Sequence, residues 1–431
     1  MQPVDLSPGL VYRAEGNANI VVAIKGTGMV LRYDKRLRDN TEVLKCLFRL
    51  PKSRSGEQCE QENLFAVERF VNNIFKPILD DFISTISVVI LDESQLETIR
   101  TSVTSFRPLK RLSKNIYTPY ALLMTDQCLL PKDAVKNPII AVEIKPKQGF
   151  LGQKSNSDNL TCNFCTKQNY LSKTGKDGGL KSEYCPLDLF SGNLSRMERA
   201  FDKLMKIPKN NLRVFMDGSL LNDENSTETE ECDAMIREIF QSRTVFKRTL
   251  IEMLTSTSSS GELGINSHDM EDELKRETRV PSTPNKHSCL DDKVTLPRNC
   301  VLDRILRLQT CSTSDVEAEK LVTNITRRGI NQTEIQKIIS GDHQMNYDLS
   351  EEATENILEL QQYCMSVTAK DLSIIVTLCQ KDVKDLKPDN SDQITVHDKM
   401  FRYKVSVIDL DPKSLDKIPS YIKNKRLWSS I

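Results

Sequence analysis

Two lysines stand two residues apart at the end of an apolar segment. Lys145 and Lys147 follow the run Ile139–Ile144, and Pro146 separates them. Side chains at alternate positions of an extended chain project to the same side, and the proline keeps Lys145 out of the helical region. Two ammonium groups held together repel each other unless an anion lies between them. The pair therefore indicates an anion site, although an ordinary exposed strand end fits the same spacing.

Two aspartates hold comparable positions late in the chain. Asp371 precedes the apolar run Ile374–Leu378, and Asp409 follows the run Val405–Ile408. Phosphoryl transfer uses two such carboxylates: one accepts the proton of the attacking hydroxyl, and the other holds the magnesium that bridges the nucleotide phosphates. An aspartate beside a strand is also a common turn or cap residue. The spacing alone leaves both interpretations open.

Three cysteines could bind a metal. Cys162 and Cys165 have the C-x₂-C spacing of a zinc half-site, and Cys185 follows twenty residues later. A closed structural zinc site needs four ligands. No histidine is near in the sequence, since the four histidines are at 268, 287, 343 and 397. The alternative is three reduced thiols without a metal.

Length and charge limit the classes of function. The 431 residues favour two or three domains, or one enzyme with two lobes. Sixty basic residues balance sixty acidic ones, so bulk charge does not attract nucleic acid. The N-terminus does not resemble a secretory signal, and no apolar run approaches the ~20 residues of a membrane span. We expect an intracellular monomer in the cytoplasm, the nucleus or both, with no membrane partner.

The segments that must position these residues alternate between strands and helices. Ile20–Ile24 and Met29–Tyr33 form a predicted hairpin. Apolar residues at steps of three and four predict a helix over 57–83, which Pro77 kinks or divides. Further predicted strands are Ala121–Leu123, Ile139–Ile144, the Asn210–Leu221 hairpin, Leu372–Leu378 and Phe401–Leu410; further predicted helices are Asp233–Leu254, Val301–Leu308, Asp315–Thr326 and Ser350–Met365.

This pattern predicts an α+β protein whose order of elements resembles a two-lobed kinase. The smaller N-terminal lobe, 1–125, carries the β-hairpin, and the larger C-terminal lobe, 126–431, carries the late strands with their aspartates. The stretch 256–289 has few large apolar residues. It cannot bury enough surface to offset the entropy of ordering, and we expect it to be a disordered insertion.

Five strings identify a resemblance. The strings are EIKPKQGF (143–150), YCPLDLFSG (184–192), NNLRVFMDGSL (210–220), TAKDLSI (368–374) and VSVIDLDPKSLDKIPSY (405–421). They occur in the order found in inositol-pentakisphosphate 2-kinases, and YRAEGNANIVVAI (12–24) also matches the first hairpin of that family. The chain resembles this family from about residue 12 to 421, outside 256–289 and much of 35–105.

The resemblance implies an ATP-dependent kinase that phosphorylates the 2-hydroxyl of inositol 1,3,4,5,6-pentakisphosphate to give the hexakisphosphate and ADP. It assigns Asp371 as the general base, Lys145 as a second catalytic residue and Asp409 as the magnesium ligand. The implied nucleotide contacts are Gly16, Asn17, Ala18, Asn19, Arg32, Met124 and Asp126; the implied substrate contacts are Arg107, Lys145, Lys147, Asn210, Arg213, Lys413, Lys417 and Tyr421.

One region departs from the family pattern. Asn163, Lys167 and Leu171 stand where the resemblance leads us to expect Arg, His and Lys. We expect Lys167 or Lys173 to substitute for the missing cations.

An alternative from another class is a catalytically inactive, kinase-like scaffold that binds inositol phosphates. The presence of both Asp371 and Asp409 favours the enzyme, and the absence of HRD-x₄-N and DFG strings disfavours a protein kinase.

Overall fold

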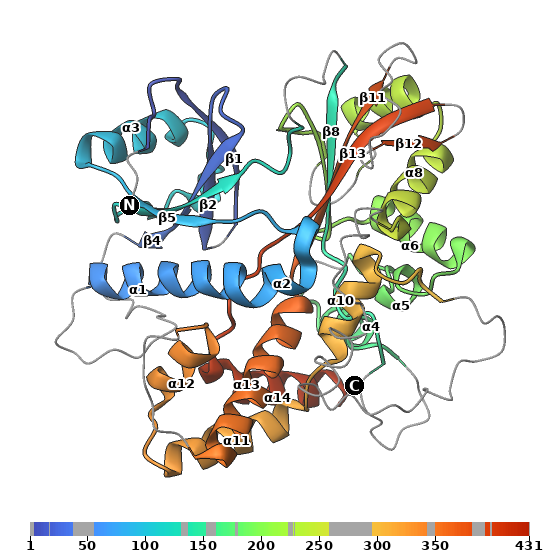
Figure 1. Ribbon diagram of the computed structural model, residues 1–431. Helices are drawn as coiled ribbons and strands as arrows, with labels where there is room; N and C mark the ends of the chain where they lie inside the picture. Colours follow the sequence, from blue (N-terminus) through green and yellow to red (C-terminus); the bar gives the residue numbers. More distant parts are fainter. Residues whose placement is uncertain are drawn as a thin grey trace, which may run out of the picture.

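The structure is a mixed α+β arrangement, as the sequence predicts, and it is built around two larger antiparallel sheets (Figure 1). It is a computed structural model that describes residues 4–16, 18–37, 56–130, 137–151, 161–176, 180–222, 227, 229–257, 295–342, 350–381, 393–396 and 399–430. The predicted insertion 256–289 lies outside these residues apart from 256 and 257. Among the described helices, none combines the length and apolar character needed to cross a bilayer.

The first sheet is built on the predicted hairpin. Its strand order is β1-β2-β3-β7-β5. The strands are β1 (Leu10–Glu15), β2 (Asn19–Ile24), β3 (Met29–Asp34), β5 (Ser87–Ile90) and β7 (Tyr120–Thr125). A capping box on Asp92 and Gln95 starts α3 (Glu93–Thr104), which packs its apolar residues on this sheet. The short strands β4 (Arg36–Leu37) and β6 (Lys114–Asn115) pair beside it.

A long helical segment lies under the first sheet and runs toward the second (Figure 1). It consists of α1 (Gly56–Arg69), a π-helical turn (Phe70–Phe75), α2 (Lys76–Leu79) and a 3₁₀ turn (Asp80–Phe82). The prediction of a helix over this range is confirmed, and its α-helical geometry is interrupted by the π turn that ends two residues before Pro77. Pro77 lacks an N–H, and the wider π turn just before it absorbs the interruption.

The second sheet carries the residues with candidate chemistry. Its order is β10-β9-β8-β11-β13-β12. The strands are β8 (Ile139–Ile144), β9 (Leu212–Met216), β10 (Ser219–Leu220), β11 (Ser373–Lys381), β12 (Gln393–Val396) and β13 (Lys399–Ile408). The central strand β11 pairs Ile374 with Ile144 and Ser373 with Ile408. The start of β11 and the ends of β8 and β13 therefore meet at one edge of the sheet.

Helices surround the second sheet and form its core with the long segment. Those before residue 300 are α4 (Asn163–Lys173), α5 (Pro186–Leu189), α6 (Leu194–Lys206), α7 (Glu230–Met235), a π turn (Ile236–Phe240) and α8 (Arg243–Thr255). Those after it are α10 (Val301–Thr310), α11 (Asp315–Arg327), α12 (Gln332–Ile339), α13 (Glu351–Ala369), a 3₁₀ turn (Leu415–Lys417) and α14 (Ile418–Trp428).

One predicted helix is wrong in its start and in its continuity. Thr229, not Asp233, caps the first turn, so the helix begins at Glu230. Gln241 then takes a positive φ of 64° and ends the π turn. Ser242 accepts from the backbone of Val245 and starts α8 as a new helix. The apolar spacing continues across this break, which is why periodicity alone does not reveal it.

Candidate active site

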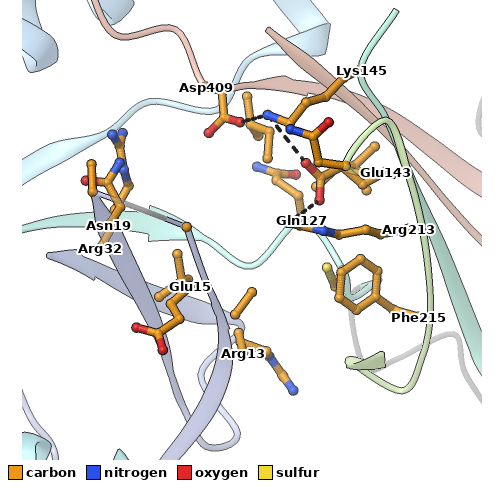
Figure 2. Close-up of a pocket in the computed structure, with 18 of the residues that line it drawn as sticks. Arg13, Glu15, Asn19, Arg32, Gln127, Glu143, Lys145, Arg213, Phe215 and Asp409 are labelled. Atoms are coloured by element: carbon orange, nitrogen blue, oxygen red, sulfur yellow. Dashed lines mark hydrogen bonds and ion pairs between the residues drawn. The ribbon is translucent and has the colours of Figure 1, made fainter. Parts of the chain in front are cut away.

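A cavity of about 1030 Å³ lies between the two sheets. Arg13, Glu15, Asn19 and Arg32 approach it from the first sheet, and Glu143, Lys145, Arg213 and Phe215 approach it from the second (Figure 2). Its volume is at the upper end of the range for small-molecule sites. Many of the side chains around it are charged, so the cavity suits a polar ligand.

Lys145 and Asp409 meet at the edge of the second sheet. Lys145 Nζ lies 2.7 Å from Asp409 Oδ2 (Figure 2). Ser373 Oγ donates to the same oxygen at 3.1 Å. Burial alone would lower the pKa of Lys145, but the charges of Asp409 and Glu143 outweigh it and raise that pKa. Burial alone would raise the pKa of Asp409, but Lys145 and Arg32 lower it. Both groups are therefore charged.

Asp371 lies between two lysines. Its Oδ1 is 3.1 Å from Lys147 Nζ, and its Oδ2 is 2.9 Å from Lys413 Nζ. Burial would raise the pKa of Asp371, but the two ammonium groups more than offset it and lower the pKa. Burial also lowers the pKa of Lys147, which Asp371 partly restores. The predicted cation pair thus contacts two different carboxylates, Lys145 with Asp409 and Lys147 with Asp371.

Buried polar side chains hold the lysine segment in place. The Tyr184 hydroxyl donates to the Pro146 carbonyl at 2.8 Å. Gln309 Nε2 donates to the carbonyls of Lys147 at 2.8 Å and Ala369 at 2.9 Å. Gln309 therefore fixes the Lys147 segment against the end of α13, directly before Asp371. No local sequence pattern in α10 marks Gln309 as part of the site.

The turn between β1 and β2 borders the other end of the cavity. Gly16, Ala18, Asn19 and Arg32 line it, whereas Asn17 lies outside the described residues. The Arg32 guanidinium forms a bidentate ion pair with Asp411, whose charge raises the pKa of Arg32 despite its burial. Asp411 also lines the cavity. No motif in the sequence marks Asp411 as a partner of Arg32.

Met124 and Asp126 line the cavity where β7 leaves the first sheet. Asp126 Oδ2 accepts from Arg13 Nε at 2.9 Å, and its Oδ1 accepts from the backbone of Cys128 at 3.0 Å. Asp126 is thus a buried residue that orders the connection between the sheets. The backbone of the segment from Met124 to Asp126 can present its N–H and C=O groups to a ligand.

The predicted substrate contacts divide into two groups. Asn210, Arg213 and Lys413 line the cavity together with Lys145 and Lys147. Arg213 Nη1 lies 3.3 Å from Glu143 Oε2. Arg107, Lys417 and Tyr421 are not among the lining residues. Burial raises the pKa of Tyr421 to about 12, and the charge of Asp371 adds to this rise.

Arg107 is buried beside the cavity instead of facing it. Its Nε lies 3.2 Å from Glu15 Oε2, and its Nη2 donates to the carbonyls of Arg111 at 2.9 Å and Lys114 at 2.6 Å. The nearby residue that lines the cavity is Arg111. Glu15 is 92 residues from Arg107 in the chain, so the sequence gives no sign of this pair.

The region that departs from the family pattern lies on α4. Asn163 donates to Gln148 at 2.9 Å, inside the protein framework. Lys167 Nζ lies 5.3 Å from the centre of the Trp428 ring. Its charge also contributes to lowering the pKa of Lys147, so Lys167 adds positive potential near the site. Lys173 is in the last turn of α4.

The three predicted cysteines form a cluster. The sulfur atoms of Cys162, Cys165 and Cys185 all lie within 4.8 Å of one another, and those of Cys162 and Cys185 are 3.9 Å apart. Tetrahedral zinc with bonds of ~2.3 Å sets its sulfur ligands about 3.8 Å apart, so the spacing fits zinc. The four histidines fall outside the described residues.

The geometry of the site defines a class of protein. A cavity with two carboxylates at adjacent strand ends and several cations around them suits the transfer of a phosphoryl group to a small anionic acceptor. The chain belongs to the inositol-pentakisphosphate 2-kinase family, whose model matches residues 12–426.

Relatives from animals and plants agree with this assignment. The chain is 26% identical to inositol-pentakisphosphate 2-kinase of Danio rerio and 28% identical to that of Arabidopsis thaliana, in both cases over 96% of this chain and 90% of the relative. A relative of the same name in Drosophila melanogaster is 27% identical over 50% of this chain and 49% of its own length. The protein is a kinase of inositol phosphate metabolism.

Proposed function

We propose that the protein transfers the γ-phosphoryl group of ATP to the 2-hydroxyl of inositol 1,3,4,5,6-pentakisphosphate, giving the hexakisphosphate and ADP. The observation that carries this proposal is the position of Asp371 and Asp409 at one sheet edge, each paired with a lysine that lines the cavity. A protein that only binds inositol phosphates has no need of two carboxylates beside the bound anion.

The charge of the substrates explains the cations. Five phosphate groups at about −1.5 to −2 each carry roughly −8 to −10. Lys147, Lys413 and Arg213 are held by carboxylates in the free protein. Phosphate groups compete with these carboxylates for the same cations. The ion pairs of the free enzyme thus keep the binding groups in place until substrate arrives.

The same exchange of partners makes Asp371 more basic. In the free enzyme Lys147 and Lys413 hold the Asp371 carboxylate ionised. When substrate phosphates draw these ammonium groups away, the pKa of Asp371 rises toward its ordinary value of about 3.9. The 2-hydroxyl proton passes to Asp371 as the oxygen bonds to the γ-phosphorus. The bond from the γ-phosphorus to the bridging oxygen breaks, and its electron pair leaves with ADP.

The first-sheet end of the cavity suits the nucleotide. We infer that Gly16, Ala18, Asn19 and Arg32 cover its phosphates and that Met124 to Asp126 passes the adenine. Asp409 offers the oxygen ligand that magnesium prefers, with Asp411 beside it in the cavity wall. Bound magnesium would neutralise charge that develops on the phosphates. Lys145, now 2.7 Å from Asp409, can then turn to the transferring phosphoryl group.

This function implies a division at the connection after β7. We propose that 1–125 forms a nucleotide-covering lobe and 126–431 a lobe that holds the inositol phosphate and the metal.

We also propose that the cluster of Cys162, Cys165 and Cys185 holds a structural zinc ion. It would fasten α4, which Cys162 caps, to the start of α5, which Cys185 precedes.

The experiment is an assay with purified protein, ATP, magnesium and inositol 1,3,4,5,6-pentakisphosphate, followed by separation of the products. We expect hexakisphosphate and ADP in equal amounts. If the pentakisphosphate binds to saturation but no hexakisphosphate forms, the protein is a scaffold and the proposed reaction is wrong. A product phosphorylated on an existing phosphate group would contradict the assignment of the 2-hydroxyl.

A further inference from the structure

Helices α4 and α14 carry a local excess of positive charge. Neither helix contains an aspartate or a glutamate. Their cations are Lys167 and Lys173 on α4, and Lys423, Lys425 and Arg426 on α14. Because the whole chain has 60 basic and 60 acidic residues, this charge reflects where the cations are placed and not the bulk composition.

The two helices meet, so their cations belong to one surface. Lys167 Nζ, on α4, lies 5.3 Å from the centre of the ring of Trp428, the last residue of α14. Lys176 follows α4 and places its Nζ 3.3 Å from the Tyr170 hydroxyl. We call the cations of the two helices, together with Lys176, the α4–α14 surface.

This surface adjoins the cavity through α4. Asn163, in the first turn of α4, donates to Gln148 at 2.9 Å, and Gln148 directly follows Lys147 of the cavity wall. One turn further along α4, Gln168 Oε1 accepts from Lys209 Nζ at 3.3 Å. Lys209 also lines the cavity. A ligand that approaches α4 is therefore already beside the cavity wall.

Nearby lysines respond to this charge. Burial lowers the pKa of Lys370 to about 8, and the charge of Lys425 adds to this fall although Asp315 opposes it. Burial likewise lowers the pKa of Lys147, and Lys167 adds to it. Asp315 lies 2.7 Å from Lys425 Nζ. The carboxylate thus offsets only part of the positive potential.

Three cations of the α4–α14 surface lie outside the cavity and face solvent. Lys176, Lys423 and Arg426 are exposed and are not among the lining residues. Within the part of the chain that the structure describes, none of them forms an ion pair with a carboxylate. They neither line the cavity nor stabilise the fold by an ion pair, so their charge acts on whatever approaches from solvent.

The charge of the substrate makes such cations effective at a distance. A pentakisphosphate carries about −8 to −10, and Coulomb attraction grows with the product of the two charges. In salt this attraction reaches roughly one Debye length, ~8 Å at physiological ionic strength. Cations around a cleft can raise the rate of association of a charged ligand about tenfold to a thousandfold.

We propose that the α4–α14 surface captures the inositol phosphate substrate by long-range attraction and directs it into the cavity, where other cations bind it. Lys176, Lys423 and Arg426 act before the substrate is seated and do not contact it afterwards. This inference rests on the proposed function, because it takes that substrate as the ligand.

The test is isothermal titration of the wild type and of the triple variant Lys176→Gln, Lys423→Gln and Arg426→Gln with the pentakisphosphate. At about 0.1 M salt we expect the variant to bind about threefold to tenfold more weakly. At about 0.5 M salt, where the Debye length is only ~4 Å, the two proteins should bind equally. No loss at 0.1 M, or a loss that persists at 0.5 M, overturns the proposal.

Isomeric ligands separate long-range attraction from contact. Tetrakisphosphates that differ only in the position of the missing phosphate carry the same charge, so the triple variant should weaken all of them by the same factor. A trisphosphate, with less charge, should be weakened less. If the loss depends on which phosphate is missing, one of the three cations contacts the bound substrate and the proposal is wrong.

The matched control removes the same amount of charge at the other end of the second sheet, by Arg237→Gln, Lys381→Gln and Lys399→Gln. Lys381 ends β11 and Lys399 begins β13, whereas Asp409 follows the last residue of β13. At ~3.3 Å per residue, β13 separates the two ends by ~30 Å. Lys399 Nζ donates to the Ile239 carbonyl, which places the π turn with Arg237 at the same end.

The control should bind the pentakisphosphate at 0.1 M salt almost as the wild type does. An equal loss in both triple variants would show that net charge, and not the α4–α14 surface, sets the affinity. Failure of the proposed function is a separate outcome, since the wild type would then bind the pentakisphosphate but form no hexakisphosphate.

Discussion

Lys147 Nζ lies 3.1 Å from Asp371 Oδ1, so the proposed base is paired with a cation that the substrate needs. The pair joins the segment after β8 to the residue before β11, and Gln309 fixes both backbones. In the proposed reaction, binding and catalysis are therefore linked through one ion pair. A phosphate that takes Lys147 also releases the base, so Asp371 gains basicity only when a correctly placed substrate is present.

The first prediction concerns Asp371→Asn. This change removes the proton acceptor but no cation, so we expect turnover to fall at least a hundredfold. Substrate affinity should stay the same or rise. In the variant, Lys147 and Lys413 do not have to break an ion pair with a carboxylate before they bind phosphate. Steady-state rates and titration with the pentakisphosphate measure the two effects.

Asp188→Asn is the control for Asp371→Asn. Asp188 is likewise held by two cations, Arg196 and Arg199, but it is not among the residues that line the cavity. The Asp188→Asn variant should have a turnover rate close to that of the wild type. If Asp371→Asn keeps more than about a tenth of that rate, Asp371 is not the general base, given the usual worth of this role.

The second prediction concerns pH. The folded protein lowers the pKa of Asp371 below its unfolded value of about 3.9. The pair therefore stabilises the fold above that pH, and the stabilisation is lost as the pH falls through the lowered pKa. Between pH 5 and 7 we expect the free energy of unfolding of the wild type to be higher than that of Asp371→Asn by about 1 kcal/mol or less. The difference is small because the Asp371 carboxylate is half-exposed. Below pH 4 the difference should shrink.

Denaturant titrations of both proteins without ligand, at several pH values, measure this difference. Added salt should reduce it, since the pair is partly exposed. A difference that grows as the pH falls would contradict the lowered pKa of Asp371.

The third prediction concerns the turn between β1 and β2. Lys35 Nζ donates to the Gly16 carbonyl and to Glu15, both at 2.6 Å. Lys35→Met should loosen this turn and raise the KM for ATP about tenfold, with smaller effects on kcat and on the KM for the pentakisphosphate. Lys35→Arg, which keeps the charge and the donors, should recover part of the loss.

Lys247→Met controls for the loss of a buried lysine. Lys247 is paired with Asp202 and does not line the cavity. The Lys247→Met variant should have a lower melting temperature than the wild type and an unchanged KM for ATP. Should Lys35→Met behave in the same way as Lys247→Met, Lys35 supports the fold only and does not position the nucleotide.

The sequence predicts the elements of the site better than their contacts. Alternating apolar residues and glycine turns identify the first hairpin, and apolar runs locate β8, β11 and β13. The register that brings Asp371 and Asp409 to one edge depends on how β11 pairs with both neighbours, and no local pattern encodes it. The pair of Arg32 with Asp411 joins residues 379 positions apart. Only the folded chain shows such a contact.

The fourth prediction concerns the cysteine cluster. Binding by thiolates adds its free energy to that of folding, so zinc should stabilise the contact between α4 and the start of α5. We expect the purified wild type to contain one zinc ion per chain by elemental analysis. Cys185→Ser should lose most of that zinc and melt at a lower temperature. Cys311→Ser, which changes a thiol outside the cluster, should keep the zinc. A wild type that holds no zinc after reconstitution, or a Cys185→Ser variant that holds as much as the wild type, would show that the three thiols are not a zinc site.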